Sequence, residues 1–255
     1  MRSMLYLLLT ISLSAFGQAA QPGPDPLADS IRSLEHWRET MIPIYMNDFG
    51  QLSRYKAANA ALGEPKPGEQ RVIFFGDSIT DGWHLDQYFS GKGYINRGIS
   101  GQTTSQMVLR FQQDVVNLKP AVVVVLAGTN DIAGNTGPIS IEDIEANYTA
   151  LADLARAHGI RLIFSSVTPV NDYTPESQNF FAQRDPAKIL ALNAWLKNYC
   201  SANGLVYLDY FSAMVDDKGL LRKDLAVDGL HPDDAGYRIM APLAEAAVKQ
   251  VLAKQ

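Results

Sequence analysis

The sequence predicts an α/β protein in which about five parallel strands form a sheet between two layers of helices. Short apolar segments, rich in β-branched and aromatic residues, alternate along the chain with longer segments of helical periodicity. The clearest strand candidate, residues 121–126, reads AVVVVL without any polar alternation. Such strands are buried on both faces, which is typical of a parallel sheet covered by helices.

The size and charge of the chain narrow the class of protein. Its 255 residues, 47% of them hydrophobic, suit one sizeable globular domain. The formal net charge of −5 leaves no basic surplus to hold a phosphate backbone, so nucleic acid is not an expected partner. Because Cys200 is the only cysteine, an internal disulfide and a cysteine-based metal site are excluded, and we expect a small core side chain there.

Residues 1–19 have the pattern of a signal peptide. Arg2 precedes an apolar run of about 13 residues, which is shorter than the roughly 20 needed to span a bilayer, and small residues follow it. The pattern predicts export to the periplasm or the medium of a bacterium, with no stable membrane insertion after cleavage. An uncleaved anchor or a disordered terminus is the alternative.

Residues 20–66 are predicted to form a linker and an N-terminal helical segment ahead of the main domain, 67–255. The linker is rich in Pro and Gly, and helical periodicity runs from Ser30 to Leu62. Pro43 is expected to bend this segment or to divide it, with a second piece from about residue 48 to 62. The sequence leaves open whether the segment is a lid, a dimer contact or a brace.

The main domain alternates strand and helix patterns to its end. The expected strands are 71–75, 94–97, 121–126, 160–165 and 205–208, and the expected helices are 103–118, 141–157, 186–202 and 233–253. In open parallel sheets, functional residues lie outside the carboxyl ends of the strands. Polar residues that directly follow a strand are therefore the candidates for a site.

The first strand runs into Gly76-Asp77-Ser78. A glycine permits a sharp turn, after which Ser78 could act as a nucleophile. Alternatively, Asp77 or Ser78 could cap the helix that follows, without any chemistry. The stretch lacks the second glycine of the Gly-x-Ser-x-Gly nucleophile elbow.

The second and third strands are followed by candidate hydrogen-bond donors. The N–H of Gly98 is unshielded by a side chain and could donate to an oxyanion, or Gly98 could be a simple turn residue. The Asn130 side-chain amide donates hydrogen bonds without carrying charge, which suits the same task. An Asx turn is the alternative for Asn130.

The last expected helix is preceded by Asp228 and His231. Asp228 lies three residues before His231 and could fold back onto the imidazole, which would leave the other ring nitrogen to accept a proton from a hydroxyl. His231 could instead cap the helix. Taken together, a nucleophile, two oxyanion donors and an Asp–His pair are the components of an acyl-transfer site.

Four segments of the sequence resemble the SGNH hydrolases, also called the GDSL esterase/lipase superfamily, from about residue 71 to the C-terminus. Within that superfamily, the sequence around these segments is most similar to exported bacterial acylhydrolases and to the platelet-activating-factor acetylhydrolase-like branch. The segments occur in the family's order: Gly76-Asp77-Ser78-Ile79, Asn96-Arg97-Gly98, Gly128-Thr129-Asn130-Asp131 and Asp228-Gly229-Leu230-His231-Pro232.

The resemblance implies a flavodoxin-like sheet of strand order 2-1-3-4-5, which is the SGNH hydrolase fold. It implies Ser78 as nucleophile, His231 as base and Asp228 as its partner. It also implies oxyanion donors at the Ser78 N–H, the Gly98 N–H and the Asn130 side chain, with no metal and no cofactor.

The reaction implied by the resemblance is hydrolysis of carboxylic esters through an acyl-serine. The substrate suggested by analogy is a short acyl group, often acetyl, on a carbohydrate or a similar small molecule. A lysophospholipase or thioesterase acting on longer chains is the alternative, and a catalytically silent carbohydrate-binding protein is a third hypothesis. Trp83 and the loop 170–186 are expected to decide how much room the acyl group has.

Overall fold

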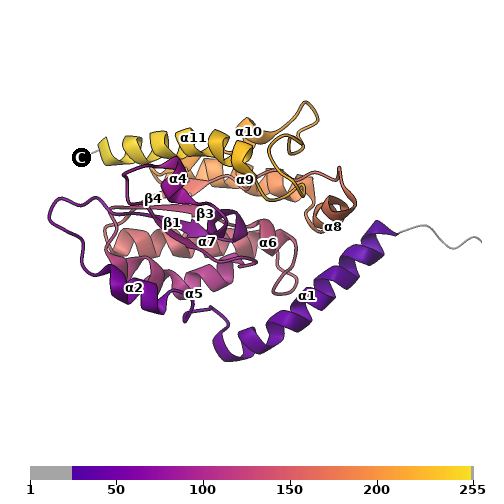
Figure 1. Ribbon diagram of the computed structural model, residues 1–255, viewed down its shortest axis with the longest axis horizontal. Helices are drawn as coiled ribbons and strands as arrows, with labels where there is room; N and C mark the ends of the chain where they lie inside the picture. Colours follow the sequence, from indigo (N-terminus) through magenta and orange to yellow (C-terminus); the bar gives the residue numbers. More distant parts are fainter. Residues whose placement is uncertain (1–24, 254–255) are drawn as a thin grey trace, which may run out of the picture.

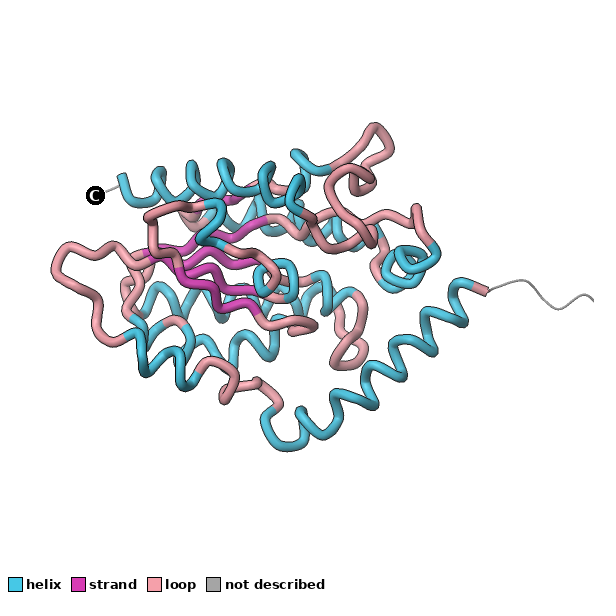
Figure 2. The backbone as a smooth tube through the Cα atoms, in the orientation of Figure 1, coloured by secondary structure: helices cyan, strands magenta, loops and turns pink. Residues whose placement is uncertain are grey.

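The computed structural model describes residues 25–253, which form a sheet between two helical layers (Figures 1 and 2). All five strands are parallel and lie in the order β2-β1-β3-β4-β5, so the predicted fold class and strand order are confirmed. The predicted signal peptide lies outside the described residues. The strands are β1 (Val72–Gly76), β2 (Ile95–Gly98), β3 (Val122–Leu126), β4 (Arg161–Ser165) and β5 (Val206–Leu208).

Helices connect the strands and cover both faces of the sheet (Figure 1). Within residues 25–253, no helix combines the length and apolar character needed to cross a bilayer. The helices are α1 (Pro26–Asp48), α2 (Lys56–Leu62), α3 (Ser78–Asp81), α4 (Leu85–Tyr88), α5 (Thr104–Asp114), α6 (Thr129–Ile132), α7 (Ile141–Ala157), α8 (Pro175–Gln183), α9 (Pro186–Ala202), α10 (Phe211–Met214) and α11 (Asp234–Ala253), with a short 3₁₀ turn, η1, at Val116–Leu118.

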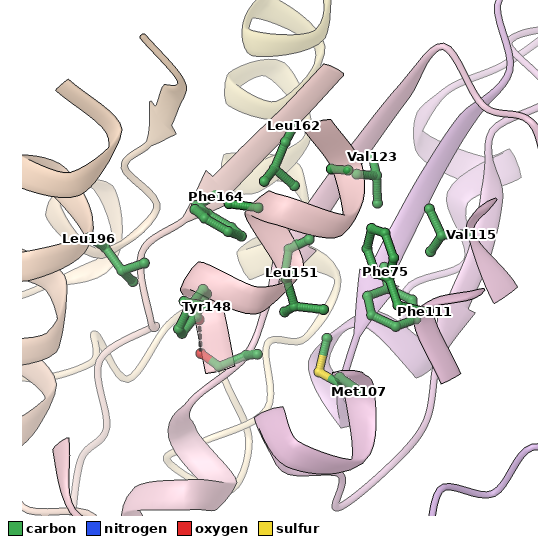
Figure 3. Packing of buried hydrophobic residues seen from close by; sticks show 14 of the residues in the cluster. Phe75, Met107, Phe111, Val115, Val123, Tyr148, Leu151, Leu162, Phe164 and Leu196 are labelled. Atoms are coloured by element: carbon green, nitrogen blue, oxygen red, sulfur yellow. Dashed lines mark hydrogen bonds between the residues drawn. The ribbon is translucent and has the colours of Figure 1, made fainter. Parts of the chain in front are cut away.

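The core lies on both faces of the sheet because successive strand side chains point to opposite sides. Ile73 and Phe75 of β1 pack with α5, α7 and α9, whereas Val72 and Phe74 pack with α4 and α11. Figure 3 shows the first of these clusters, in which the rings of Phe75 and Phe111 meet edge to face. Cys200 is buried in the same cluster, as expected.

The N-terminal helical segment differs from its prediction. Helix α1 continues through Pro43 to Asp48, so the proline does not divide it, and the next helix begins only at Lys56. Proline removes the hydrogen bond to the carbonyl four residues earlier. That residue, Glu39, is solvent-exposed, which keeps the cost of the lost bond small.

The segment 170–186, expected as a loop, contains helix α8. Thr174 and Ser177 form a reciprocal capping box at its start, and Pro175 occupies the first helical turn. A capping box normally has Glu or Gln at its third helical position. Because Ser177 stands there instead, the sequence pattern did not indicate the start of a helix.

The carboxyl ends of β1 and β2 are joined by Arg110, which projects from α5 and has no exposed surface. Its guanidinium donates to the carbonyls of Gly76 and Arg97, at 2.9 Å each, and to Asp114 at 3.1 Å. The guanidinium also lies 4.1 Å from the centre of the Phe75 ring. Arg110 therefore fixes the two strand ends immediately before Ser78 and Gly98.

Replacing Arg110 should destabilise the fold strongly. The Arg110→Met variant removes the charged partner of the buried Asp114 carboxylate, which keeps the Asn59 amide as a donor, and one donor from each of two backbone carbonyls. We expect the free energy of unfolding to fall by about 3–5 kcal/mol, because a buried charge is left without its counter-charge. Urea denaturation measures this change. Leu109→Ala, at the neighbouring exposed position of α5, serves as control and should change it by less than about 1 kcal/mol. An Arg110→Met variant as stable as the control would contradict the role given to Arg110.

Candidate active site

Ser78 is the first residue of α3, directly beyond the end of β1. Asp77 caps that helix, because its Oδ1 accepts the Ile79 N–H at 3.0 Å. Asp77 therefore takes the role of helix cap, which leaves Ser78 as the candidate nucleophile. The Ser78 Oγ lies 3.0 Å from Nε2 of His231.

Asp228 folds back onto His231, as the sequence analysis expected. Its Oδ2 lies 2.6 Å from Nδ1 of His231, and its Oδ1 accepts the backbone N–H groups of Leu230 at 3.0 Å and His231 at 2.7 Å. Burial raises the pKa of Asp228, but the hydrogen bonds from the His231 ring and backbone outweigh burial and lower that pKa to about 2. An ionised Asp228 only accepts, so Nδ1 is the ring nitrogen that carries a proton, which leaves Nε2 as the nitrogen that can accept from the Ser78 hydroxyl.

The loop that carries Asp228 and His231 is supported by the segment leading into α8. The Tyr173 hydroxyl accepts the Gly229 N–H at 3.0 Å and donates to the Ala226 carbonyl. The Phe180 ring meets His231 edge to face, with 5.7 Å between the ring centres. Tyr173 thus braces the loop from behind, whereas Phe180 reaches the site itself.

Gly98 does not occupy the place that the sequence analysis gave it. Its N–H donates to Asn96 Oδ1 at 2.8 Å, and Gly98 does not line the cleft that contains Ser78. The expectation that this N–H serves an oxyanion therefore fails for this structure. Gly98 is needed for packing, because a Cβ there would lie 2.1 Å from the backbone nitrogen of Asp81.

Gly101, three residues later, lies where Gly98 was expected. It lines the cleft with Ser78 and Asn130, and its φ of +78° favours glycine. Asn135 holds the loop by donating from Nδ2 to the Gly101 carbonyl at 3.0 Å. Among residues 25–253, neither the Gly101 N–H nor the Ser78 N–H has a backbone or side-chain acceptor.

The Asn130 side chain lies at the floor of the cleft and is 3% exposed. Its Nδ2 donates to the Gln102 carbonyl at 3.1 Å, and its Oδ1 accepts from Nη2 of Arg184 at 3.1 Å. These two bonds fix which end of the amide carries the hydrogens. One N–H of Nδ2 is left without a partner in the described part of the chain.

Arg184 was not identified from the sequence. It follows α8, is 3% exposed, and also donates from Nε to Thr129 Oγ1 at 3.0 Å. It forms no ion pair with a carboxylate of residues 25–253; burial lowers its pKa to about 10, against the attraction of Asp77 and Asp228. No motif marks such an arginine, because its role depends on where α8 packs.

The cleft has a volume of about 500 Å³, and its floor holds Ser78, Asn130 and His231. His231 and the buried Arg184 are the ionisable side chains among its lining residues in the described chain. Trp83 does not line it: the ring is 2% exposed and stacks on Tyr237 within the core. The expectation that Trp83 limits the room for substrate is therefore wrong. One wall comes from helix α1.

The protein combines a parallel sheet covered by helices with a Ser–His–Asp hydrogen-bond chain beyond the carboxyl edge of that sheet. This combination is typical of serine hydrolases. Comparison with known proteins makes the family specific. The profile of the GDSL-like lipase/acylhydrolase family matches residues 74–239, and the chain belongs to that family.

Individual relatives agree with this assignment. The crystal structure of a GDSL-like lipase from Bacteroides thetaiotaomicron is 40% identical, with a TM-score of 0.73, over 80% of this chain and 99% of that one. An acetylxylan esterase of Xylanibacter ruminicola is 26% identical over 226 residues, covering 74% of this chain and 45% of the relative. A Bacillus subtilis protein described as an uncharacterized lipoprotein is 30% identical over 136 residues, covering 46% of this chain and 56% of the relative. The chain thus spans about half the length of these two relatives.

Proposed function

We propose that the protein hydrolyses carboxylic esters through an acyl intermediate on Ser78. The observation that carries the proposal is the hydrogen-bond chain from Ser78 Oγ through His231 to Asp228, at the floor of a cleft. Membership in the GDSL-like lipase/acylhydrolase family supports the same reaction.

In the first half of the reaction, Nε2 of His231 takes the Ser78 hydroxyl proton as Oγ bonds to the ester carbonyl carbon. The ionised Asp228 stabilises the imidazolium that forms. When the tetrahedral intermediate collapses, the carbon–oxygen bond to the alcohol breaks, and the alcohol leaves with the proton from His231. The second half repeats these steps with water, which releases the carboxylic acid and restores Ser78.

Three donors would hold the negative oxygen of the intermediate: the Ser78 N–H, the Gly101 N–H and the free N–H of Asn130. All three residues line the cleft, and none of these N–H groups is used within the described part of the chain. Donors fixed before the reaction stabilise charge without reorganisation. Gly101 replaces Gly98 in this scheme because the Gly98 N–H is already bonded to Asn96.

The substrate we propose is a short acyl ester, in particular acetyl, of a carbohydrate or a similar neutral alcohol. The cleft holds about 500 Å³, and its lining mixes the apolar side chains of Leu34, Trp37, Phe180 and Leu230 with polar ones, whereas a long acyl chain would need an extended apolar groove. A relative named acetylxylan esterase supports the acetyl and carbohydrate assignment. Export, proposed from residues 1–19, would give the enzyme access to such polymers, and one relative is described as a lipoprotein.

Ser78→Ala tests the reaction. We expect loss of at least about a thousandfold in kcat on 4-nitrophenyl acetate, because the covalent route needs the hydroxyl. Stopped or continuous absorbance assays of the purified protein give the rate. Ser201→Ala, exposed at the end of α9, is the matched control and should keep the wild-type rate. Full activity in Ser78→Ala would refute the assignment.

A series of 4-nitrophenyl esters from acetate to dodecanoate tests the acyl preference. The limited volume and mixed polar and apolar lining of the cleft predict the highest kcat/KM at acetate and a fall of about a hundredfold by octanoate. A maximum at octanoate or longer would instead support a lysophospholipase or thioesterase activity.

Asn130 and Arg184 should act as one unit. Asn130→Ala should lower kcat by roughly a hundred- to a thousandfold, and Arg184→Met should lower it by at least about tenfold, because the amide loses the bond that orients it. Once Asn130 is alanine, adding Arg184→Met should cost little more, whereas Arg184→Lys alone should retain part of the rate. Steady-state kinetics of the four variants measure this. Losses that simply multiply would contradict the coupling.

A further inference from the structure

Helix α1 lies outside the segments that resemble the family, yet it is fixed against the site at several points. Near its start, the Ser30 hydroxyl donates to the Asn179 carbonyl of α8, and Gln183 donates back to the Ser30 carbonyl, at 3.1 Å each. Further along, the Arg38 guanidinium donates to the Gly134 carbonyl. Beyond its end, the Gln106 amide donates to the Phe49 carbonyl at 2.8 Å. Figure 1 shows the helix running diagonally past α5 and α6 towards α8.

The inner face of α1 forms a wall of the catalytic cleft. Ser33, Leu34 and Trp37 line it, and their spacing places them on one face of the helix. The Trp37 ring packs directly on Gly101: a Cβ at that glycine would lie 2.7 Å from Cζ2 of the ring. Trp37 therefore stands beside the loop that holds one of the proposed oxyanion donors.

The same cleft is also lined by uncharged polar side chains. Asn179 and Gln183 of α8, with Ser100 and Asn135, supply amides and a hydroxyl. Among residues 25–253, the side chains of Ser33 and Asn179 make no hydrogen bond, so both can pair with a ligand. The Arg184 guanidinium is occupied by Thr129, Asn130 and Phe180, so within residues 25–253 the lining offers no unpaired arginine or lysine to hold a phosphate.

We propose that the inner face of α1 and the facing part of α8 form the subsite for the alcohol portion of the ester, and that this portion is a sugar ring. The indole of Trp37 offers a flat apolar surface with a negative π cloud. One face of the sugar ring, which carries C–H groups, can stack on this surface. Ser33 and Asn179 bond its hydroxyls. The inference rests on the proposed function, since an alcohol subsite has meaning only if Ser78 attacks an ester beside it.

Two acetyl esters that differ only in the alcohol test the subsite. On acetylated xylotetraose, Trp37→Ala should lower kcat/KM by about tenfold or more, mainly through KM. On vinyl acetate, whose two-carbon alcohol is too small to use the subsite, the variant should stay within about twofold of wild type. The Gly101 loop should keep its shape because Asn135 holds its carbonyl. Trp37→Phe, which keeps a ring, should give an intermediate loss on the oligosaccharide.

Ile31→Ala is the matched control, because Ile31 is on the same helix, 50% exposed and not among the lining residues; it should leave both rates unchanged. Equal losses on both esters in Trp37→Ala, or no loss on either, would overturn the subsite. A wild-type protein that hydrolyses vinyl acetate but no acetylated oligosaccharide would overturn the sugar assignment. A wild-type protein inactive on both would instead contradict the proposed function.

Discussion

The site depends on the hydrogen bonds by which Arg110 joins the carboxyl ends of β1 and β2. One guanidinium reaches the Gly76 and Arg97 carbonyls, which immediately precede the turn to Ser78 and the loop to Gly101. Its charge is balanced by Asp114 one helical turn away. The relative position of the nucleophile and the oxyanion loop is thereby fixed inside the core, where no solvent competes for these bonds.

The rest of the cleft is assembled from segments distant in sequence. The segment before α11 supplies Asp228 and His231. Helix α8 supplies Phe180, which contacts the imidazole, and Arg184, directly after α8, donates to Asn130. Helix α1 closes the remaining side and is tied to α8 by the Ser30 bonds. Ser78 beyond β1 and the Asp228–His231 pair before α11 form the hydrogen-bond chain, and we propose that α1 and α8 select the alcohol.

Sequence patterns predicted most of the sheet because β1 and β3 consist almost wholly of side chains that need burial on both faces. The end of a parallel strand is a fixed place, which made Ser78 a candidate, and the resemblance to the family implied that Asp228 and His231 act with it. The patterns failed to distinguish Gly98, the last residue of β2, from Gly101 in the loop that follows, because the choice depends on which N–H Asn96 occupies and on how closely α3 approaches. Arg184 and the wall at Trp37 were missed because both require knowing how α8 and α1 pack, which local periodicity does not encode.

The central claim is that Ser78 is the activated nucleophile, and covalent labelling tests it most directly. Incubation with the organophosphate paraoxon, followed by intact-mass measurement and peptide mapping, should show one diethylphosphoryl group on Ser78. His231→Ala should label far more slowly, because the hydroxyl then lacks the base that lies 3.0 Å from it. An unlabelled protein, or a label on another serine with Ser78 unmodified, would contradict the account.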